Sequence, residues 1–163
     1  MPGEFINDQN RGQDLFPEEG ADPIRRQEME KKIQILILDD EPIVGKRLGP
    51  ALTKMGAEVE VFENPVKALE RIQEKTFDIV VTDIRMDDMD GIEILEKVKD
   101  RSAETKVIMI TGYATVEVAR EALGKGAFDF IAKPFKPGDL RDVIVKAAES
   151  MGYKGLSRPD PKS

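Results

Sequence analysis

The side chains best placed to do chemistry are carboxylates that directly follow apolar runs. Asp39, Asp40 and Glu41 follow the run at residues 33–38, and Asp83 follows the run at residues 79–82. Carboxylates brought together repel one another, and their pKa values rise unless a cation neutralises the group. An all-oxygen cluster suits Mg²⁺, with Mn²⁺ as the alternative hard cation.

Two other polar side chains are placed in the same way. Thr111 follows the apolar run at 107–110, and Lys133 follows the run at 128–132. Taken singly, a threonine after a strand is more often a cap or turn residue than a ligand, and an exposed lysine is usually solvated. Their joint placement suggests more, because a cation, an ammonium and a hydroxyl directed at one carboxylate describe a phosphoryl-transfer site. Asp83 would be its nucleophile.

The composition excludes several other chemistries. The chain contains no Cys and no His, so it lacks disulfides, thiolate or imidazole metal ligands, and a phosphohistidine of its own. Its net charge is −7 without a long basic run, so we expect no direct nucleic-acid binding. Its first residues show no basic segment followed by an apolar core, and no apolar stretch approaches the ~20 residues that span a bilayer. We therefore expect a soluble, cytoplasmic protein.

The apolar runs alternate with stretches of helical period, which predicts an α/β fold. The expected strands are residues 33–38, 59–62, 79–82, 107–110 and 128–132. Five successive βα units predict a doubly wound five-stranded parallel sheet with helices on both faces. The first, third and fourth strands fit central positions, and the less apolar second strand fits an edge.

Capping residues and prolines predict where helices begin and where one helix is disturbed. Asn64 and Pro65 predict a cap and a first-turn proline. The last helix is predicted by apolar residues spaced three and four apart, namely Leu140, Val143, Ile144, Ala147, Ala148 and Met151. Pro50 falls inside the first helical stretch and predicts a kink or a broken helix there.

The polar ends of the chain flank a single predicted domain. Residues 1–31 and 153–163 read as an N-terminal tail or linker and a polar C-terminal tail, and residues 32–152 as the domain. We expect no output domain within the C-terminal tail at residues 153–163.

Four segments resemble the signature blocks of response-regulator receiver domains, and they occur in that family's order. They are residues 35–42 (ILILDDEP), 81–91 (VTDIRMDDMDG), 110–114 (ITGYA) and 126–135 (GAFDFIAKPF). The resemblance covers roughly residues 32 to 152 and implies a flavodoxin-like fold with strand order 2-1-3-4-5. The local sequence around Thr111 and Lys133 is similar to that of receivers of the nitrogen-regulation, sigma-54 activator type.

The resemblance implies a phosphoacceptor and a metal site. Asp83 would be phosphorylated, and Asp40, Asp83 and the backbone carbonyl of Arg85 would bind Mg²⁺ directly. Asp39 would act through metal-bound water. The chain would accept a phosphoryl group without turning over external substrates.

The resemblance also implies a switch. Lys133 would pair with a phosphoryl oxygen, Thr111 would donate its hydroxyl to the phosphoryl group, and the ring of Phe130 would swing inward. Phe130 lacks the hydroxyl of the family's tyrosine, and Asp87 replaces a proline found in many members.

Partners follow from the same resemblance. The donor would be a sensor histidine kinase or a histidine phosphotransfer protein, or a small acyl phosphate, with the helix after Pro42 as the docking surface. Phosphorylated receivers often dimerise through their last two helices, and the sequence leaves the oligomeric state, the kinase and the output open.

Two other functions remain as alternatives. One is an aspartate-nucleophile hydrolase of the haloacid dehalogenase kind, although that class carries its nucleophile after the first strand in an Asp-x-Asp motif. The other is a degenerate receiver that acts only as an interaction module.

Overall fold

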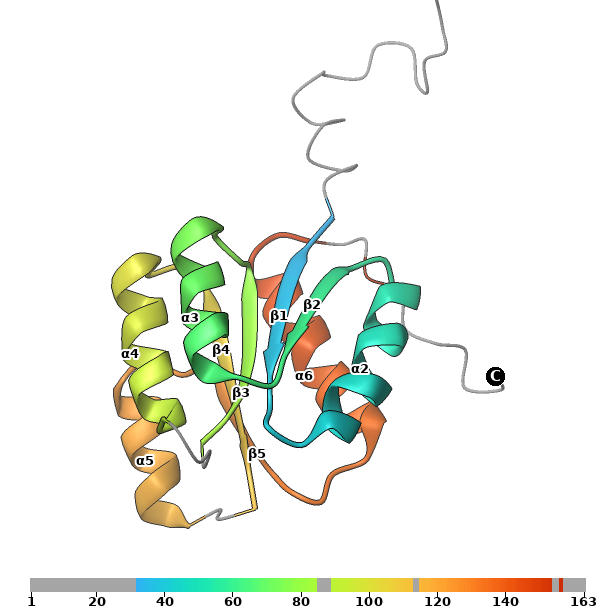
Figure 1. Ribbon diagram of the computed structural model, residues 1–163. Helices are drawn as coiled ribbons and strands as arrows, with labels where there is room; N and C mark the ends of the chain where they lie inside the picture. The colour runs from blue at the N-terminus through green and yellow to red at the C-terminus, as the bar shows by residue number, and fades with distance from the viewer. Residues whose placement is uncertain (1–31, 85–88, 113–114, 154–155, 157–163) are drawn as a thin grey trace, which may run out of the picture. The chain divides into compact units, whose positions relative to one another are not determined.

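The computed structural model describes residues 32–84, 89–112, 115–153 and 156. Within them, five parallel strands form one sheet with helices on both sides (Figure 1). The strands are β1 (Gln34–Leu38), β2 (Glu58–Phe62), β3 (Ile79–Asp83), β4 (Lys106–Thr111) and β5 (Asp129–Ala132). The helices are α2 (Pro42–Lys54), α3 (Pro65–Glu74), α4 (Gly91–Arg101), α5 (Val116–Gly124) and α6 (Pro137–Ser150). No helix in these ranges is both long and apolar enough to cross a bilayer.

The strand order is β2-β1-β3-β4-β5, which confirms the predicted doubly wound sheet. The three most apolar strands, β1, β3 and β4, are internal, and β2 lies at an edge as expected. In the register of the sheet, Leu38 pairs with Thr82, Asp83 with Ile110, and Thr111 with Ala132. The residues that follow the strands therefore meet at one rim, where open parallel sheets bind their ligands.

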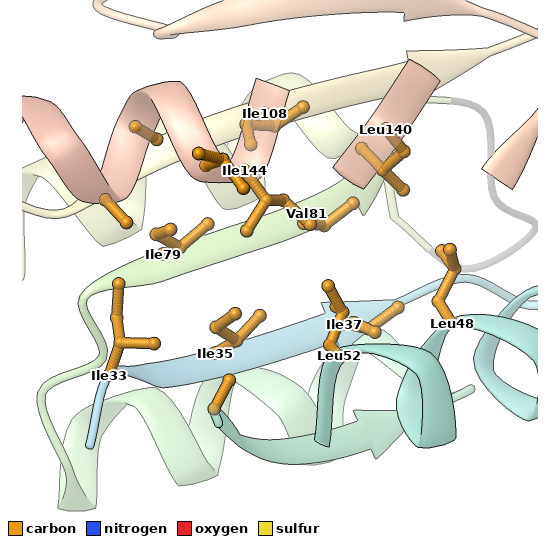
Figure 2. Close-up of a cluster of buried hydrophobic side chains, with 14 of the residues drawn as sticks. Ile33, Ile35, Ile37, Leu48, Leu52, Ile79, Val81, Ile108, Leu140 and Ile144 are labelled. Carbon is orange, nitrogen blue, oxygen red and sulfur yellow. The ribbon is translucent and has the colours of Figure 1, made fainter. Parts of the chain in front are cut away.

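Each face of the sheet has its own apolar core. Ile35 and Ile37 of β1 pack with α2 and α6, and this α2–α6 core is drawn in Figure 2. Leu36 and Leu38 point to the opposite face, toward α3, α4 and α5. Alternate residues of one strand are thus buried on both sides, which explains why the strand reads as a continuous apolar run. The two cores therefore cover the sheet from both sides.

The predicted start of α3 is confirmed. The Asn64 side chain accepts hydrogen bonds from the backbone N–H groups of Val66 and Lys67 at 2.8 and 3.1 Å, and Pro65 is the first residue of α3. A kink or a broken helix was predicted at Pro50; the break is wrong, because α2 continues from Pro42 to Lys54, and the kink stays a prediction. Pro50 and Lys46 are both exposed, so water can bond the carbonyl that proline leaves without a donor.

Two residues of the predicted C-terminal tail touch the domain. Tyr153 and Leu156 pack against the α2–α6 core, and the Tyr153 hydroxyl donates to Asp78 Oδ2 at 3.3 Å. Burial, together with the nearby Asp78 carboxylate, raises the pKa of Tyr153 to about 12. The hydroxyl therefore stays protonated at neutral pH. The domain boundary at residue 152 stays a prediction.

Gly45 lets α2 approach β2 closely. A Cβ atom at Gly45 would lie 2.2 Å from Val61 Cγ1, whereas one at Gly49 would lie 3.4 Å from Val61 Cγ2. We expect Gly45→Ala to lower the free energy of unfolding by about 1–3 kcal/mol through overpacking. Gly49→Ala is the matched control and should be neutral or stabilising by up to about 1 kcal/mol, since alanine favours helix. Urea unfolding measures both, and Val61→Ala should rescue only the Gly45 variant. Equal effects of the two substitutions would contradict the close contact.

Candidate functional site

Lys133 is the centre of the polar cluster at the rim. Its ammonium lies 2.8 Å from Asp83 Oδ2 and 2.9 Å from Asp39 Oδ2, and it donates a short hydrogen bond to Glu41 Oε1. Burial opposes the charge, but the hydrogen bonds to these carboxylates outweigh it and hold the pKa of Lys133 above its ordinary value. The ammonium is therefore charged throughout the physiological range.

Asp39 is the most deeply buried carboxylate of the cluster. Burial raises its pKa, against the lowering effects of the Glu41 backbone N–H and the Lys133 ammonium, and the Asp83 charge raises it further. The Glu41 N–H donates to Asp39 Oδ1 at 2.8 Å. Asp39 Oδ2 contacts Lys133 as an ion pair, yet it has no well-aligned hydrogen-bond donor among the described residues. Such a buried oxygen is costly unless another cation or donor reaches it.

The cluster fits a divalent cation. One oxygen each from Asp39, Glu41 and Asp83 lies within 4.8 Å of the others. Three carboxylates around a single ammonium leave two negative charges in excess. The donors are all hard oxygens, and the poorly satisfied Asp39 Oδ2 faces this group. The excess negative charge, the oxygen ligands and the poorly satisfied Asp39 oxygen all favour binding of a hard divalent cation.

Gly91 sets the backbone around Asp83. Its N–H donates to the carbonyl of Ile84 at 2.7 Å, and α4 begins at this residue. A Cβ atom at Gly91 would lie 2.1 Å from the Asp83 carbonyl oxygen and 2.7 Å from Ile84 Cα. Both are backbone atoms, which cannot turn aside as a side chain can. Only glycine allows the start of α4 to press against the end of β3.

We expect Gly91→Ala to lower the free energy of unfolding by about 2–3 kcal/mol, because α4 or the strand end must move. Gly112→Ala is the control, since Gly112 follows Thr111 at the same rim and an added Cβ would meet nothing within 4 Å. Thermal unfolding of both variants makes the comparison. If they were equally stable, the close approach at Gly91 would be disproved.

The structure brings some of the predicted site residues into contact and leaves others outside the carboxylate cluster. Asp39, Asp83 and Lys133 are in contact. Asp40 follows Asp39 at the rim, half-buried, and stands outside the group of three carboxylates. Thr111 is fully buried at the end of β4, where its carbonyl accepts the Lys133 N–H at 2.8 Å.

The remaining predictions concern Phe130, Arg85 and Asp87. Phe130 is half-buried on β5 and packs against the α3–α5 face of the sheet. Arg85 and Asp87 lie outside the described residues, so the metal-binding carbonyl stays a prediction.

Glu41 was grouped with Asp39 and Asp40 as a carboxylate at a strand end, but no role in the site was predicted for it. It stands at the N-cap position of α2, an ordinary place for an acidic residue, and its side chain makes no cap hydrogen bond. It contacts Lys133, which lies 92 residues away in the sequence. Its position directly after Asp39 and Asp40 was the available signal.

Comparison with known proteins supports the geometry. The response regulator receiver domain matches residues 35–145, more than half of the chain. The regulatory protein AtoC of Escherichia coli K12 is 39% identical over 121 residues, which are 74% of this chain and 26% of AtoC. A CheY-like receiver domain protein of Methanospirillum hungatei JF-1 is 33% identical with a TM-score of 0.72, covering 75% of this chain and 98% of that one. The beryllofluoride-activated NtrC4 receiver domain dimer is 32% identical with a TM-score of 0.68, covering 71% and 96%.

These matches define what the chain shares with its relatives. The chain spans about a quarter of the length of the curated relatives it matches, several of which are transcriptional regulatory proteins. The solved receiver domains, in contrast, are covered almost completely. The chain belongs to the response-regulator receiver domain family, the phosphoacceptor switches of two-component signalling.

Proposed function

We propose that Asp83 is the phosphoacceptor of this receiver and takes its phosphoryl group from a partner's phosphohistidine. The observation that carries the proposal is the contact of the Asp83 carboxylate with the Lys133 ammonium at the carboxyl end of the central strand β3. A carboxylate oxygen of Asp83 attacks phosphorus, the P–N bond breaks, and the imidazole nitrogen keeps the bonding electron pair. The product is an acyl phosphate, which carries one more negative charge than the carboxylate.

Lys133 supplies positive charge where negative charge develops. Its ammonium already lies at hydrogen-bond distance from Asp83 Oδ2 and needs only a small rotation to reach a phosphoryl oxygen. Donors fixed beside the reacting atoms are among the largest contributions to catalysis. We assign the hydroxyl of Thr111 to a second phosphoryl oxygen, since Thr111 ends the neighbouring strand β4.

Mg²⁺ is the cation we propose for the acidic cluster, where it would neutralise the excess charge and orient the phosphoryl group. Asp39, Asp40, Asp83 and the Arg85 carbonyl are its proposed ligands, with Mn²⁺ as a substitute. Asp39 and Asp83 bring carboxylate oxygens to the rim, and the chain has no His or Cys that would favour a softer metal.

The switch follows from charge and packing. The added phosphoryl charge favours the arrangement that pairs it best, which shifts an existing equilibrium. We propose that Thr111 moves toward the phosphoryl group and that Phe130, on the adjacent strand β5, fills the space that it leaves. The movement would reach the surface of α5 and β5.

We propose that the donor is a sensor histidine kinase or a histidine phosphotransfer protein. Phosphohistidine is made with ATP, so the encounter belongs in the cytoplasm. Phosphorylation-dependent dimerisation is also proposed, since the similar NtrC4 receiver was solved as a beryllofluoride-activated dimer. The chain does not turn over external substrates under this proposal.

Intact mass spectrometry tests the proposal. The chain is incubated with acetyl phosphate in the presence of Mg²⁺ or of a chelator. One phosphoryl adduct per chain should form with Mg²⁺ and should be lost with the chelator. Absence of an adduct at any Mg²⁺ concentration would favour an interaction module, and continuous release of phosphate in large excess over the chain would favour a hydrolase.

A further inference from the structure

The Lys133 ammonium contacts three carboxylates, which differ sharply in exposure. The side chains of Asp39 and Asp83 are 1% and 7% exposed, whereas the Glu41 side chain is 59% exposed. Lys133 itself is 17% exposed. The exposed ion pair is the weakest of the three, because water screens it and solvates the released carboxylate. Glu41 is therefore the partner that Lys133 can give up most easily.

A phosphoryl oxygen competes for the same ammonium. An ammonium has three N–H donors; in this structure two of them are hydrogen-bonded to Asp83 and Glu41, and Asp39 Oδ2 lies beside the ammonium as an ion pair without a well-aligned donor. Asp39 and Asp83 are buried, so losing contact with the ammonium costs them more than it costs the exposed Glu41. Glu41 is therefore the carboxylate that an incoming phosphoryl oxygen displaces most easily.

Glu41 also carries charge that acts on any anionic donor. The cluster has two negative charges in excess, and Glu41 is its most accessible member. Its carboxylate adds to the attraction for a cation and to the repulsion of an anion entering the same space. A single side chain should thus act with opposite sign on the two ligands of the site.

We infer that Glu41 is a positioning residue that holds the Lys133 ammonium at Asp83 before transfer and competes with the incoming phosphoryl group for it. This inference rests on the proposed function of Asp83. It makes Glu41 a temporary substitute for the phosphoryl group: its carboxylate occupies the donor that the phosphoryl oxygen will use. Glu41 thereby tunes the site against free anions and in favour of the cation.

The test compares Glu41→Gln with Glu63→Gln in the full 163-residue chain. Glu63 is an exposed carboxylate that follows β2 at the same rim, and the substitution removes the same charge. Titration calorimetry measures Mg²⁺ affinity, and ¹⁹F NMR measures beryllofluoride affinity at saturating Mg²⁺. Beryllofluoride is the probe because it occupies the place of a phosphoryl group without a covalent transfer.

Glu41→Gln should weaken Mg²⁺ binding and tighten beryllofluoride binding, each by about three-fold, as the loss of one exposed ion pair predicts. Glu41→Asp, which restores the charge, should return both affinities toward those of the unaltered chain. Glu63→Gln should change neither. Opposite changes in the two affinities distinguish competition for Lys133 from a general loss of fold, which would weaken the binding of both ligands.

Two failures remain distinguishable. If the unaltered chain binds beryllofluoride and Glu41→Gln behaves like Glu63→Gln, or weakens both ligands, the inference about Glu41 is wrong while the function of Asp83 stands. If the unaltered chain binds no beryllofluoride at any Mg²⁺ concentration, the proposed function itself fails and the inference fails with it.

Discussion

Asp83→Asn should abolish phosphorylation by acetyl phosphate completely. The amide oxygen of asparagine is a poor nucleophile, and no other carboxylate of the cluster occupies the same position at the end of β3. The change is nearly isosteric and keeps an acceptor for Lys133. It also removes one charge from a cluster with an excess of negative charge, so the free energy of unfolding without Mg²⁺ should not fall.

Intact mass and urea unfolding are measured together for this variant. Asp100→Asn serves as the control, because Asp100 is exposed near the far end of α4. The control should form the adduct at the normal rate. An Asp83→Asn chain that is folded and still takes up one phosphoryl group with unchanged kinetics would place the acceptor elsewhere.

Lys133→Met should slow phosphorylation by about 100-fold or more, the typical effect of removing one preorganised donor. Methionine has similar length and flexibility but no charge. Asp39 and Asp83 would also lose their shared counter-ion, and we expect the free energy of unfolding to fall by up to about 3 kcal/mol at neutral pH. Added Mg²⁺ should restore part of this loss, because a cation bound to the folded state stabilises it.

Stopped-flow or quenched mass measurements give the rate, and thermal unfolding with and without Mg²⁺ gives the stability. Lys146→Met, at an exposed position of α6, is the matched control and should change neither quantity. Normal phosphorylation kinetics in a folded Lys133→Met chain would show that the ammonium has no part in transfer.

Much of the fold could be predicted from sequence because its signals are local. β1 is buried on both faces, which makes residues 35–38 a continuous apolar run, and Asn64 with Pro65 marks the start of α3 by side-chain and ring chemistry. The alternation of strands and helices then allows only a parallel sheet with right-handed crossovers. The strand order itself came from family resemblance, since periodicity carries no information about which strands are neighbours.

Pro50 shows where local signals mislead. Its missing N–H predicts a disturbed helix, but Leu48 and Leu52 bury one side of α2 against the sheet while Pro50 faces water. Tertiary packing offsets the lost hydrogen bond, and the helix continues.

The candidate site could be predicted in its residue types and only partly in its geometry. Asp39, Asp83 and Lys133 were predicted to meet because strand ends converge, and they do. Glu41 and Gly91 were not recognised as contributors, because their roles depend on contacts with Lys133 and with the Asp83 backbone that only the folded chain brings together. A helix cap and a turn glycine look the same in sequence whether or not they touch a reactive carboxylate.

The most direct test of Asp83 as the phosphoacceptor is to locate the residue to which the phosphoryl group is covalently bound. The chain is phosphorylated with acetyl phosphate and Mg²⁺, then reduced with borohydride, which converts a phosphorylated aspartate to homoserine, and the product is mapped by peptide mass spectrometry. Homoserine at residue 83 alone is the expected result. Homoserine at residue 39 or 40, or at no residue of a chain that has taken up phosphate, would contradict the assignment of Asp83 as the phosphoacceptor.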